Sequence, residues 1–412
     1  MPKIIPFRAV RPTRDKVGLV AARSHESYSK KGRKFRMDRN PYSFLHIINP
    51  GYKYHKEIKG KKGFTLVRNR YQEFKEDKIF MKEEEASFYI YKIIDRNGEV
   101  FSGLIAAASV FDYENNIIKK HEDTIADREE LFKEYLDIVG FNAEAVLLTY
   151  PDNDTIASII AKTTKARAEY EFTTTYRDTH YLWPLSDSKS VAIIQKAFEQ
   201  MPQLYIADGH HRSSSSYLLA KDHQQNDENY HEDAPYNYFM SYLLPESDIR
   251  IHEFNRLIKD LNGLSKEEFL IALDTNFRIE NRGLTAYKPS KKHHFSMYLD
   301  GEFYSLYLRK SNYNFENTLE ALDPQILYRT VLEPILGISD LRNDSRITYA
   351  GGKKDMVYTK SVIDKEEYKV GFGMLPLTMD ELKQIADDGY TMPPKSTYIE
   401  PKLRSGITIY EF

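Results

Sequence analysis

A segment over residues 204–220 carries side chains suited to binding an anion. An apolar strand pattern changes there to a polar helix pattern, through Asp208, Gly209, His210, His211 and Arg212. A helix start offers backbone N–H groups and the positive end of the macrodipole, and glycine lets the backbone approach a ligand closely. Histidine and arginine add donors that suit phosphate oxygens, and the aspartate can hold a metal ion or a proton. A capped polar turn closed by a salt bridge is the structural alternative.

A second polar cluster, Lys120 to Thr124, stands directly before a predicted helix. It contains His121 and Glu122, but Ile125 occupies the position where a zinc protease needs its second histidine, which excludes that class. Glu122, preceded by His121 at a helix mouth, is placed as a general base near a bound anion. Alternatively, Thr124 caps the helix while the acidic residues favour its positive end, and the local sequence favours this alternative.

A third cluster lies near the C-terminus, where two prolines precede Lys395, Ser396 and Thr397. The prolines fix an extended lead, so these side chains could project together toward an anion, with Lys402 and Arg404 following. Residues 407–412 form an apolar ending that predicts a docked strand. Such a strand explains the ending but not the Lys-Ser-Thr group.

The stretch 40–46 mixes polar and apolar residues and is a candidate pocket wall. Its polar members are Asn40, Ser43 and His46. For His46, a half-buried histidine with satisfied hydrogen bonds is the structural alternative.

Short strands and helices that alternate along the chain predict an α+β fold. Asn97-Gly98 favours a tight hairpin between strands at 88–94 and 100–110. Further strands are expected at 145–150, 180–184, 203–208, 239–244, 294–299 and 303–308, and helices at 124–139, 187–200, 323–336 and from Thr378. Neither a dinucleotide-binding nor a Walker glycine motif is present.

Composition narrows the class of protein. With 412 residues, 41% apolar and 29% charged, the chain is large enough for two or three packed units. The absence of cysteine excludes disulfides, thiolate metal sites and thiol chemistry. No stretch approaches the roughly 20 apolar residues of a membrane span, and the first residues do not resemble a secretory signal, so we expect a cytoplasmic protein without a membrane partner.

The net charge of −2 conceals a basic beginning. Residues 1–70 carry 19 lysines and arginines against 4 acidic residues. The cationic runs at 30–36 and 59–62 could attract nucleic acid, a polyphosphate substrate or the acidic remainder of the chain, and a solvated basic face is the structural alternative.

Together these motifs resemble the family known as domain of unknown function 1015. The resemblance spans nearly the whole chain and rests on segments 5–12, 40–46, 120–124, 205–212 and 393–406, in the family's order. That family looks like a branch of the ParB/sulfiredoxin superfamily, and some of its relatives are free-serine kinases, including forms that use pyrophosphate. The resemblance therefore implies a mixed-sheet ParB/sulfiredoxin-like core at 86–225, a basic segment at 1–85, and an α+β region at 237–412 that completes the active-site cleft.

The resemblance also assigns roles to the clusters. It implies that the residues from Asp208 to Arg212 hold the donor phosphates, that Ser213 and Ser214 offer helical N–H groups, and that Glu122 accepts the serine proton. Lys395, Ser396 and Lys402 are expected to contact phosphate, and Asn40, Ser43, His46 and Thr124 to contact substrate. His121 joins the catalytic group, and Asp208 is the expected ligand of Mg²⁺.

The sequence thus predicts a kinase that converts free L-serine to O-phosphoserine, with pyrophosphate or a nucleotide as donor. Two departures from the family pattern bear on this: the stretch 24–28 differs from the usual one and leaves the substrate open, and Arg128 replaces a usual lysine. One alternative is a ParB-like nucleotide- and DNA-binding protein without kinase activity, although no helix-turn-helix pair follows the phosphate turn and we do not expect a nucleic-acid partner. The other is a catalytically silent scaffold.

Overall fold

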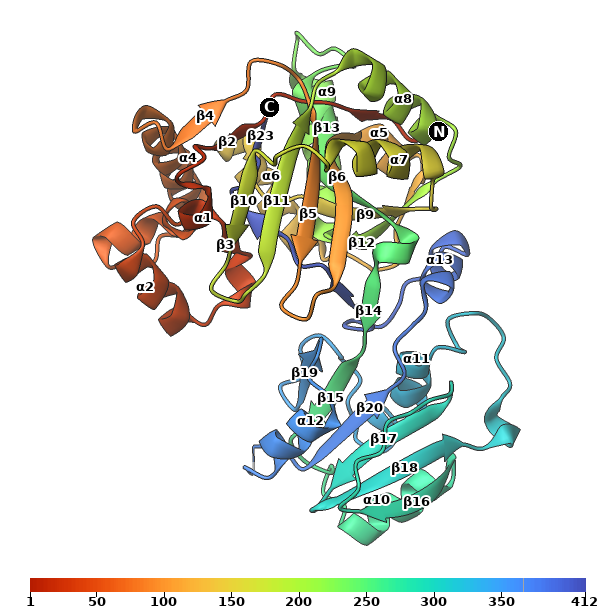
Figure 1. The fold of residues 1–412 in the computed structure, drawn as a ribbon. Coiled ribbons are helices and arrows are strands. Elements are labelled where there is room, and N and C mark those ends of the chain that lie inside the picture. The colour runs from red at the N-terminus through yellow and green to blue at the C-terminus, as the bar shows by residue number, and fades with distance from the viewer. Residues whose placement is uncertain (366) are drawn as a thin grey trace. The chain divides into compact units, whose positions relative to one another are not determined.

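The computed structural model describes residues 1–365 and 367–412, which divide into two units (Figure 1). The first unit comprises Met1–Lys120, Thr124–Ile249 and Pro401–Phe412, and the second comprises His121–Asp123 and Arg250–Glu400. The expected boundaries near residues 85 and 237 do not separate these units. Strand β1 (Ile4–Ile5) and strand β13 (Tyr238–Pro245) both pair with β6 (Val100–Ser109), so the beginning and the middle of the chain share one sheet.

The first unit is built on a mixed sheet of nine strands. Their order is β10-β11-β5-β6-β13-β9-β12-β7, with β1 on β6. Pairs β13/β9 and β12/β7 are parallel and the other pairs are antiparallel. The remaining strands are β5 (Phe88–Ile94), β7 (Ile118–Lys119), β9 (Val146–Tyr150), β10 (Tyr170–Thr173), β11 (Thr179–Leu185) and β12 (Leu204–Asp208). The α+β class is confirmed.

The hairpin of β5 and β6 follows from its turn residues. Gly98 has φ +85°, a left-handed conformation that glycine adopts without steric cost. The Asp95 carboxylate accepts the backbone N–H groups of Asn97 at 2.8 Å and Glu99 at 2.9 Å. This Asx turn confirms the predicted hairpin and fixes the register in which Tyr89 faces Ile105.

Amphipathic helices complete the core of the first unit. Helices α7 (Asp154–Thr163) and α8 (Ser188–Glu199) bury Ile156, Ile194 and Phe198 against the sheet. A satellite core of helices packs around Val10 and Phe141. The other helices of this unit are α1 (Val17–Val20), α2 (Lys30–Arg39), α3 (Leu45–Ile48), α4 (Gly60–Glu76), α5 (Val110–Glu114), α6 (Ala126–Val139) and α9 (His210–Asn226).

The second unit is a six-stranded antiparallel sheet with helices on both faces. Its order is β16-β18-β17-β20-β15-β19. One face packs against α10 (Lys266–Asp274), α11 (Asp323–Leu327) and the π-helical turn Tyr328–Leu332, and the other against α12 (Met356–Ile363). The strands are β15 (Phe254–Ile258), β16 (Phe277–Gly283), β17 (His294–Leu299), β18 (Glu302–Leu308), β19 (Ile347–Gly351) and β20 (Val370–Met374). Helix α13 (Met379–Asp387) begins at the predicted Thr378 capping box.

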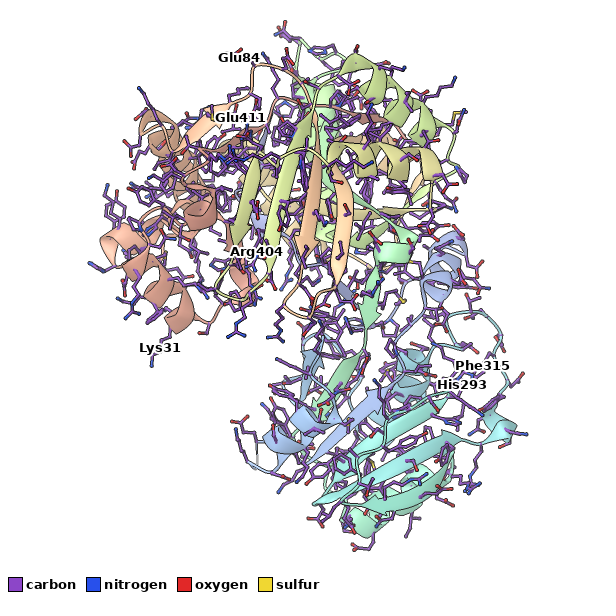
Figure 2. All side chains as sticks on the ribbon, in the orientation of Figure 1. Lys31, Glu84, His293, Phe315, Arg404 and Glu411 are labelled. Atoms are coloured by element: carbon purple, nitrogen blue, oxygen red, sulfur yellow. The ribbon has the colours of Figure 1, made fainter. Side chains whose placement is uncertain are left out.

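The C-terminal residues belong to the first unit. Strand β22 (Arg404–Ser405) pairs with β3 (Ala22–Arg23), and β23 (Tyr410–Glu411) pairs with β8 (Phe141–Asn142). Glu411, labelled in Figure 2, accepts hydrogen bonds from Lys75 at 2.7 Å and Lys82 at 2.8 Å. The predicted docked strand is confirmed. Among the helices of the described residues, none is long and apolar enough to cross a membrane.

Candidate functional site

The turn between β12 and α9 brings charged side chains to the start of a helix. The strand is buried up to Ala207, and Gly209 turns the chain with φ +106° before α9 begins at His210. As the N-cap, Gly209 has no side chain that could bond the first N–H groups of the helix. A Cβ on Gly209 would lie 3.0 Å from the Arg212 guanidinium, which folds back over the turn. Backbone donors and a fixed cation therefore share one small region.

Two cations flank the Asp208 carboxylate. The Arg212 Nη2 atom lies 3.3 Å from one carboxylate oxygen, and the Lys402 Nζ atom lies 3.4 Å from the other. Burial raises the pKa of Asp208, but the charges of Lys402 and Arg212 outweigh burial and hold that pKa below its usual range. Asp208 is thus a carboxylate at neutral pH.

Arg212 is anchored by a second contact. Its Nη1 atom donates to the carbonyl oxygen of Ala145, directly before the start of β9. These two hydrogen bonds use two of the five N–H donors of a guanidinium, so others remain for a ligand. The anchoring lowers the entropy that Arg212 would lose when it binds a phosphate.

His210 contributes hydrogen bonding rather than charge. It is buried, and burial lowers its pKa to about 3, with the charges of Arg212 and Lys120 acting in the same direction. The imidazole is therefore neutral at pH 7 and carries one N–H. Lys120, whose Nζ lies 5.5 Å from the centre of the Tyr113 ring, brings a third positive charge toward the turn. The local sequence around Lys120 does not reveal this proximity, because the turn lies much further along the chain, at Asp208.

The serines of the first helical turns differ from expectation. The Ser213 N–H already donates to the Gly209 carbonyl at 3.1 Å, so this donor is not available to a ligand. The Ser214 hydroxyl donates to Glu129 on α6, and so does the Thr124 hydroxyl. The sequence did not single out Glu129, because its contact with Ser214 depends on the packing of α6 against α9. Thr124 does not cap α6, whose N-cap is Ile125.

His121 and Glu122 belong to the second unit. The His121 carbonyl accepts the N–H of Met392 at 2.9 Å, and the Asp123 carboxylate accepts the Thr391 hydroxyl at 3.1 Å. His121 is fully buried and Glu122 is half-buried. Asp112, a further acidic residue, lies in the first unit, where its buried carboxylate accepts the backbone N–H of Lys3 at 2.6 Å.

The C-terminal cluster is divided between the units. Lys395 and Ser396 lie in the second unit, whereas Lys402 lies in the first beside Asp208. The Ser396 hydroxyl is buried and donates to the Pro393 carbonyl at 2.7 Å. The Lys395 Nζ atom lies 5.7 Å from the centre of the Phe254 ring.

The stretch 40–46 lies in the first unit, around α3. His46 Nε2 lies 3.2 Å from the Met37 carbonyl oxygen and 3.0 Å from that of Asn40, and burial lowers the pKa of this half-buried ring. The Asn40 amide donates to the Leu19 carbonyl at 2.7 Å, and the buried Ser43 hydroxyl accepts a weak hydrogen bond from Leu45 at 3.4 Å. These three predicted contact residues thus form hydrogen bonds within the first unit.

Several basic residues near the start of the chain form hydrogen bonds or ion pairs with other residues of the chain. Arg33 donates to the carbonyl oxygen of Tyr28 at 3.1 Å, Lys34 pairs with Asp38 at 3.0 Å, and Arg36 donates to the Tyr176 hydroxyl at 2.7 Å. Lys31, labelled in Figure 2, is exposed on α2. Several of the predicted cations therefore stabilise the helical region locally.

These features define an α+β protein of two units, one of which carries a charged strand-to-helix turn. The chain belongs to the family described as protein of unknown function (DUF1015), whose model matches residues 4–325. No curated protein matches the chain.

Three similar solved structures share little sequence with this chain. A free serine kinase point mutant in complex with AMP is 11% identical, with a TM-score of 0.38, over 75% of this chain and 92% of that one. SbnI with a C-terminal truncation, from Staphylococcus aureus, is 12% identical, with a TM-score of 0.38, over 74% and 85%. A conserved hypothetical protein from Pyrococcus furiosus is 12% identical, with a TM-score of 0.36, over 74% and 94%.

Proposed function

We propose that this chain is a small-molecule kinase that phosphorylates the hydroxyl of free L-serine, with pyrophosphate as the phosphoryl donor. The observation that carries the proposal is the turn after β12, where Arg212 and Lys402 flank Asp208 at the start of α9. Phosphoryl transfer depends on neutralising the charge of the transferring group and on aligning the reacting oxygens. Anchored cations and helix N–H groups supply that neutralisation.

Serine is the proposed acceptor because the motifs resemble those of free-serine kinases. In the proposed reaction the serine oxygen forms a bond to phosphorus, the bridging P–O bond of pyrophosphate breaks, and inorganic phosphate leaves. Glu122 is proposed to accept the hydroxyl proton, with His121 beside it. Asn40, Ser43, His46 and Thr124 are proposed to contact serine, and Lys395 and Ser396 to contact phosphate.

Mg²⁺ is the proposed cofactor, and Asp208 its proposed protein ligand. Within the described residues, no group of three or more histidine or acidic side chains is arranged around a common metal position. One carboxylate with substrate phosphates is nevertheless a usual magnesium environment, and the lowered pKa of Asp208 keeps its carboxylate available. When bound, the ion would neutralise negative charge on the donor.

The test is an activity assay with separate donors. Purified protein is incubated with L-serine, Mg²⁺ and pyrophosphate, ADP or ATP, and O-phosphoserine is measured by mass spectrometry. We expect phosphoserine with pyrophosphate. Product with a nucleotide alone would correct the donor, and no product with any of the three would refute the proposal.

The Glu122→Gln variant tests the proton acceptor. The amide has nearly the shape of the carboxylate but cannot accept the proton, so turnover should fall by roughly 10²- to 10⁴-fold. Pyrophosphate affinity, measured by calorimetry, should stay near that of the unchanged protein. Glu130→Gln, at an exposed site on α6, is the matched control. Unchanged turnover in Glu122→Gln would remove Glu122 from the mechanism.

A further inference from the structure

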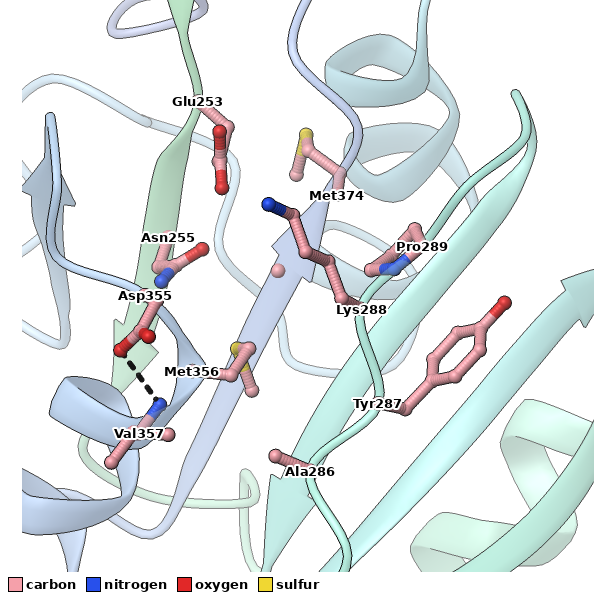
Figure 3. Close-up of a pocket in the computed structure, with 11 residues that line it drawn as sticks. Glu253, Asn255, Ala286, Tyr287, Lys288, Pro289, Asp355, Met356, Val357 and Met374 are labelled. Carbon is pink, nitrogen blue, oxygen red and sulfur yellow. Dashed lines mark hydrogen bonds between the residues drawn. The ribbon is translucent and has the colours of Figure 1, made fainter.

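The second unit contains a small pocket above strand β20 (Figure 3). It has a volume of about 110 Å³ and is lined by β15, β20, the start of α12 and the segment 286–289. Since one water molecule occupies roughly 30 Å³ in the liquid and drug-sized ligands need about 300 Å³ or more, a pocket of this size suits a very small ligand.

Opposite charges face this pocket from its two sides. Figure 3 shows the Glu253 carboxylate and the Lys288 ammonium group extending toward the same space. Among the residues that the structure describes, neither side chain forms an ion pair. A third charged residue, Asp355, uses its carboxylate to cap α12 through the N–H groups of Val357 and Tyr358, both at 3.0 Å. The pocket thus offers one carboxylate and one ammonium group to a ligand.

A buried amide adds an oriented acceptor. Asn255 is 1% exposed, and its Nδ2 donates to the Lys354 carbonyl at 2.9 Å and to the Thr359 hydroxyl at 3.1 Å. Because a carbonyl oxygen can only accept, these contacts fix which end of the amide is nitrogen. The Oδ1 atom faces Gly373, where an added Cβ would lie 3.1 Å from it. No described residue donates to this oxygen, so a ligand can.

The rest of the lining is apolar and closely packed. Met356 and Met374 are buried, and a Cβ on Gly373 would lie 2.7 Å from the Met356 sulfur. Glycine on β20 therefore lets the thioether reach the pocket floor. Methionine side chains adapt to apolar groups of different shape, so this part of the pocket suits a short aliphatic group.

We propose that this pocket binds a small zwitterionic α-amino acid with an apolar side chain. Glu253 and the Asn255 oxygen receive the ligand's ammonium group, Lys288 receives its carboxylate, and the two methionines contact its side chain. This site is made only of second-unit residues and uses none of the residues proposed to bind phosphate. It goes beyond the proposed kinase activity and does not depend on it.

The first test is calorimetric titration of the full chain with L-alanine, L-valine and L-methionine. Each is compared with its N-acetyl derivative, which lacks the ammonium charge, and with its methyl ester, which lacks the carboxylate. At least one free amino acid should bind, and each modification should weaken binding by about tenfold or more. Absence of binding by all three up to about 10 mM, or equal binding of the derivatives, would overturn the proposal.

Variants assign the two ligand charges. Glu253→Gln should weaken binding of the free amino acid but leave binding of its N-acetyl derivative unchanged. Lys288→Met should weaken binding of the free amino acid but leave binding of its methyl ester unchanged. Glu267→Gln and Lys259→Met remove equivalent charges at exposed positions of the same unit and should bind normally. If the controls lose affinity equally, the site is not where we place it.

L-Serine distinguishes the two sources of such a ligand. A pocket that holds the kinase acceptor would bind serine, and Glu253→Gln would raise the serine KM. An effector site would bind the apolar amino acids more tightly and leave the serine KM unchanged in that variant. Both outcomes retain the amino-acid site. The KM comparison requires turnover, but the affinities of the pocket for amino acids are measured without it, so a failure of the kinase proposal leaves the binding test intact.

Discussion

Replacing Lys402 with methionine should weaken donor binding far more than it weakens the fold. Lys402 lies 3.4 Å from Asp208, and the side chains of both are about as exposed as surface groups, at 40% and 43%. An ion pair of this exposure contributes only about 0.2–1 kcal/mol to stability, because water and salt screen it. Methionine keeps the length and apolar stem of the side chain, so packing changes little.

The expected loss of binding is larger because a phosphate places more negative charge beside the ammonium group. A charge-assisted hydrogen bond contributes about 1.5–3 kcal/mol, which corresponds to roughly a 10- to 150-fold higher Kd for pyrophosphate. The loss of Lys402 also removes one of the two charges that hold down the pKa of Asp208. Asp208 should therefore titrate at a higher pH in the variant.

The assay pairs calorimetric titration with pyrophosphate and denaturant unfolding of the same samples. Lys75→Met is the matched control, since it removes a lysine that pairs with Glu411 at 2.7 Å elsewhere in the same unit. The control should bind pyrophosphate normally. Wild-type affinity in Lys402→Met, or an equal loss in Lys75→Met, would refute the reasoning that Lys402 contacts the donor.

Two further substitutions test the turn and a buried histidine. Gly209→Ala should destabilise the fold by about 1–3 kcal/mol and weaken pyrophosphate binding, because φ +106° strains alanine and the new Cβ meets Arg212; unfolding and titration would detect both. His180 is 1% exposed, and burial, helped by Arg404, lowers its pKa to about 3. As the pH is lowered, the unfolded state therefore takes up this proton before the folded state does. The free energy of unfolding is unaffected above about pH 6.5 and is lower by about 2 kcal/mol at pH 5. In the His180→Asn variant, the free energy of unfolding in urea should decrease by about 2 kcal/mol less between pH 7 and pH 5 than in the unchanged protein. An unchanged pH dependence would contradict the attribution of this decrease to His180.

Local sequence was sufficient wherever a short-range pattern determines the structure. Asn97-Gly98 predicted the β5/β6 hairpin, the Thr378 capping box predicted the start of α13, and the apolar-to-polar change at Asp208 predicted the junction of β12 and α9. Each depends on interactions within a few residues, such as turn conformation or helix capping. These elements together confirm the α+β class.

Contacts between distant segments could not be predicted in this way. The insertion of β13 beside β6, the meeting of Lys402 with Asp208, and the bonding of Glu129 to Ser214 all depend on tertiary packing. The pocket between Glu253 and Lys288 has no local pattern either, because its charges come from separate segments. The motif resemblance supplied the proposed reaction, which geometry alone does not specify.

The most direct test of the central claim is a crystal structure of the protein saturated with pyrophosphate and Mg²⁺. The account predicts phosphate oxygens against the opening N–H groups of α9, with Arg212 and Lys402 in contact with them. Pyrophosphate bound away from this turn, or absent from the saturated crystal, would contradict the claim that the turn after β12 holds the phosphoryl donor.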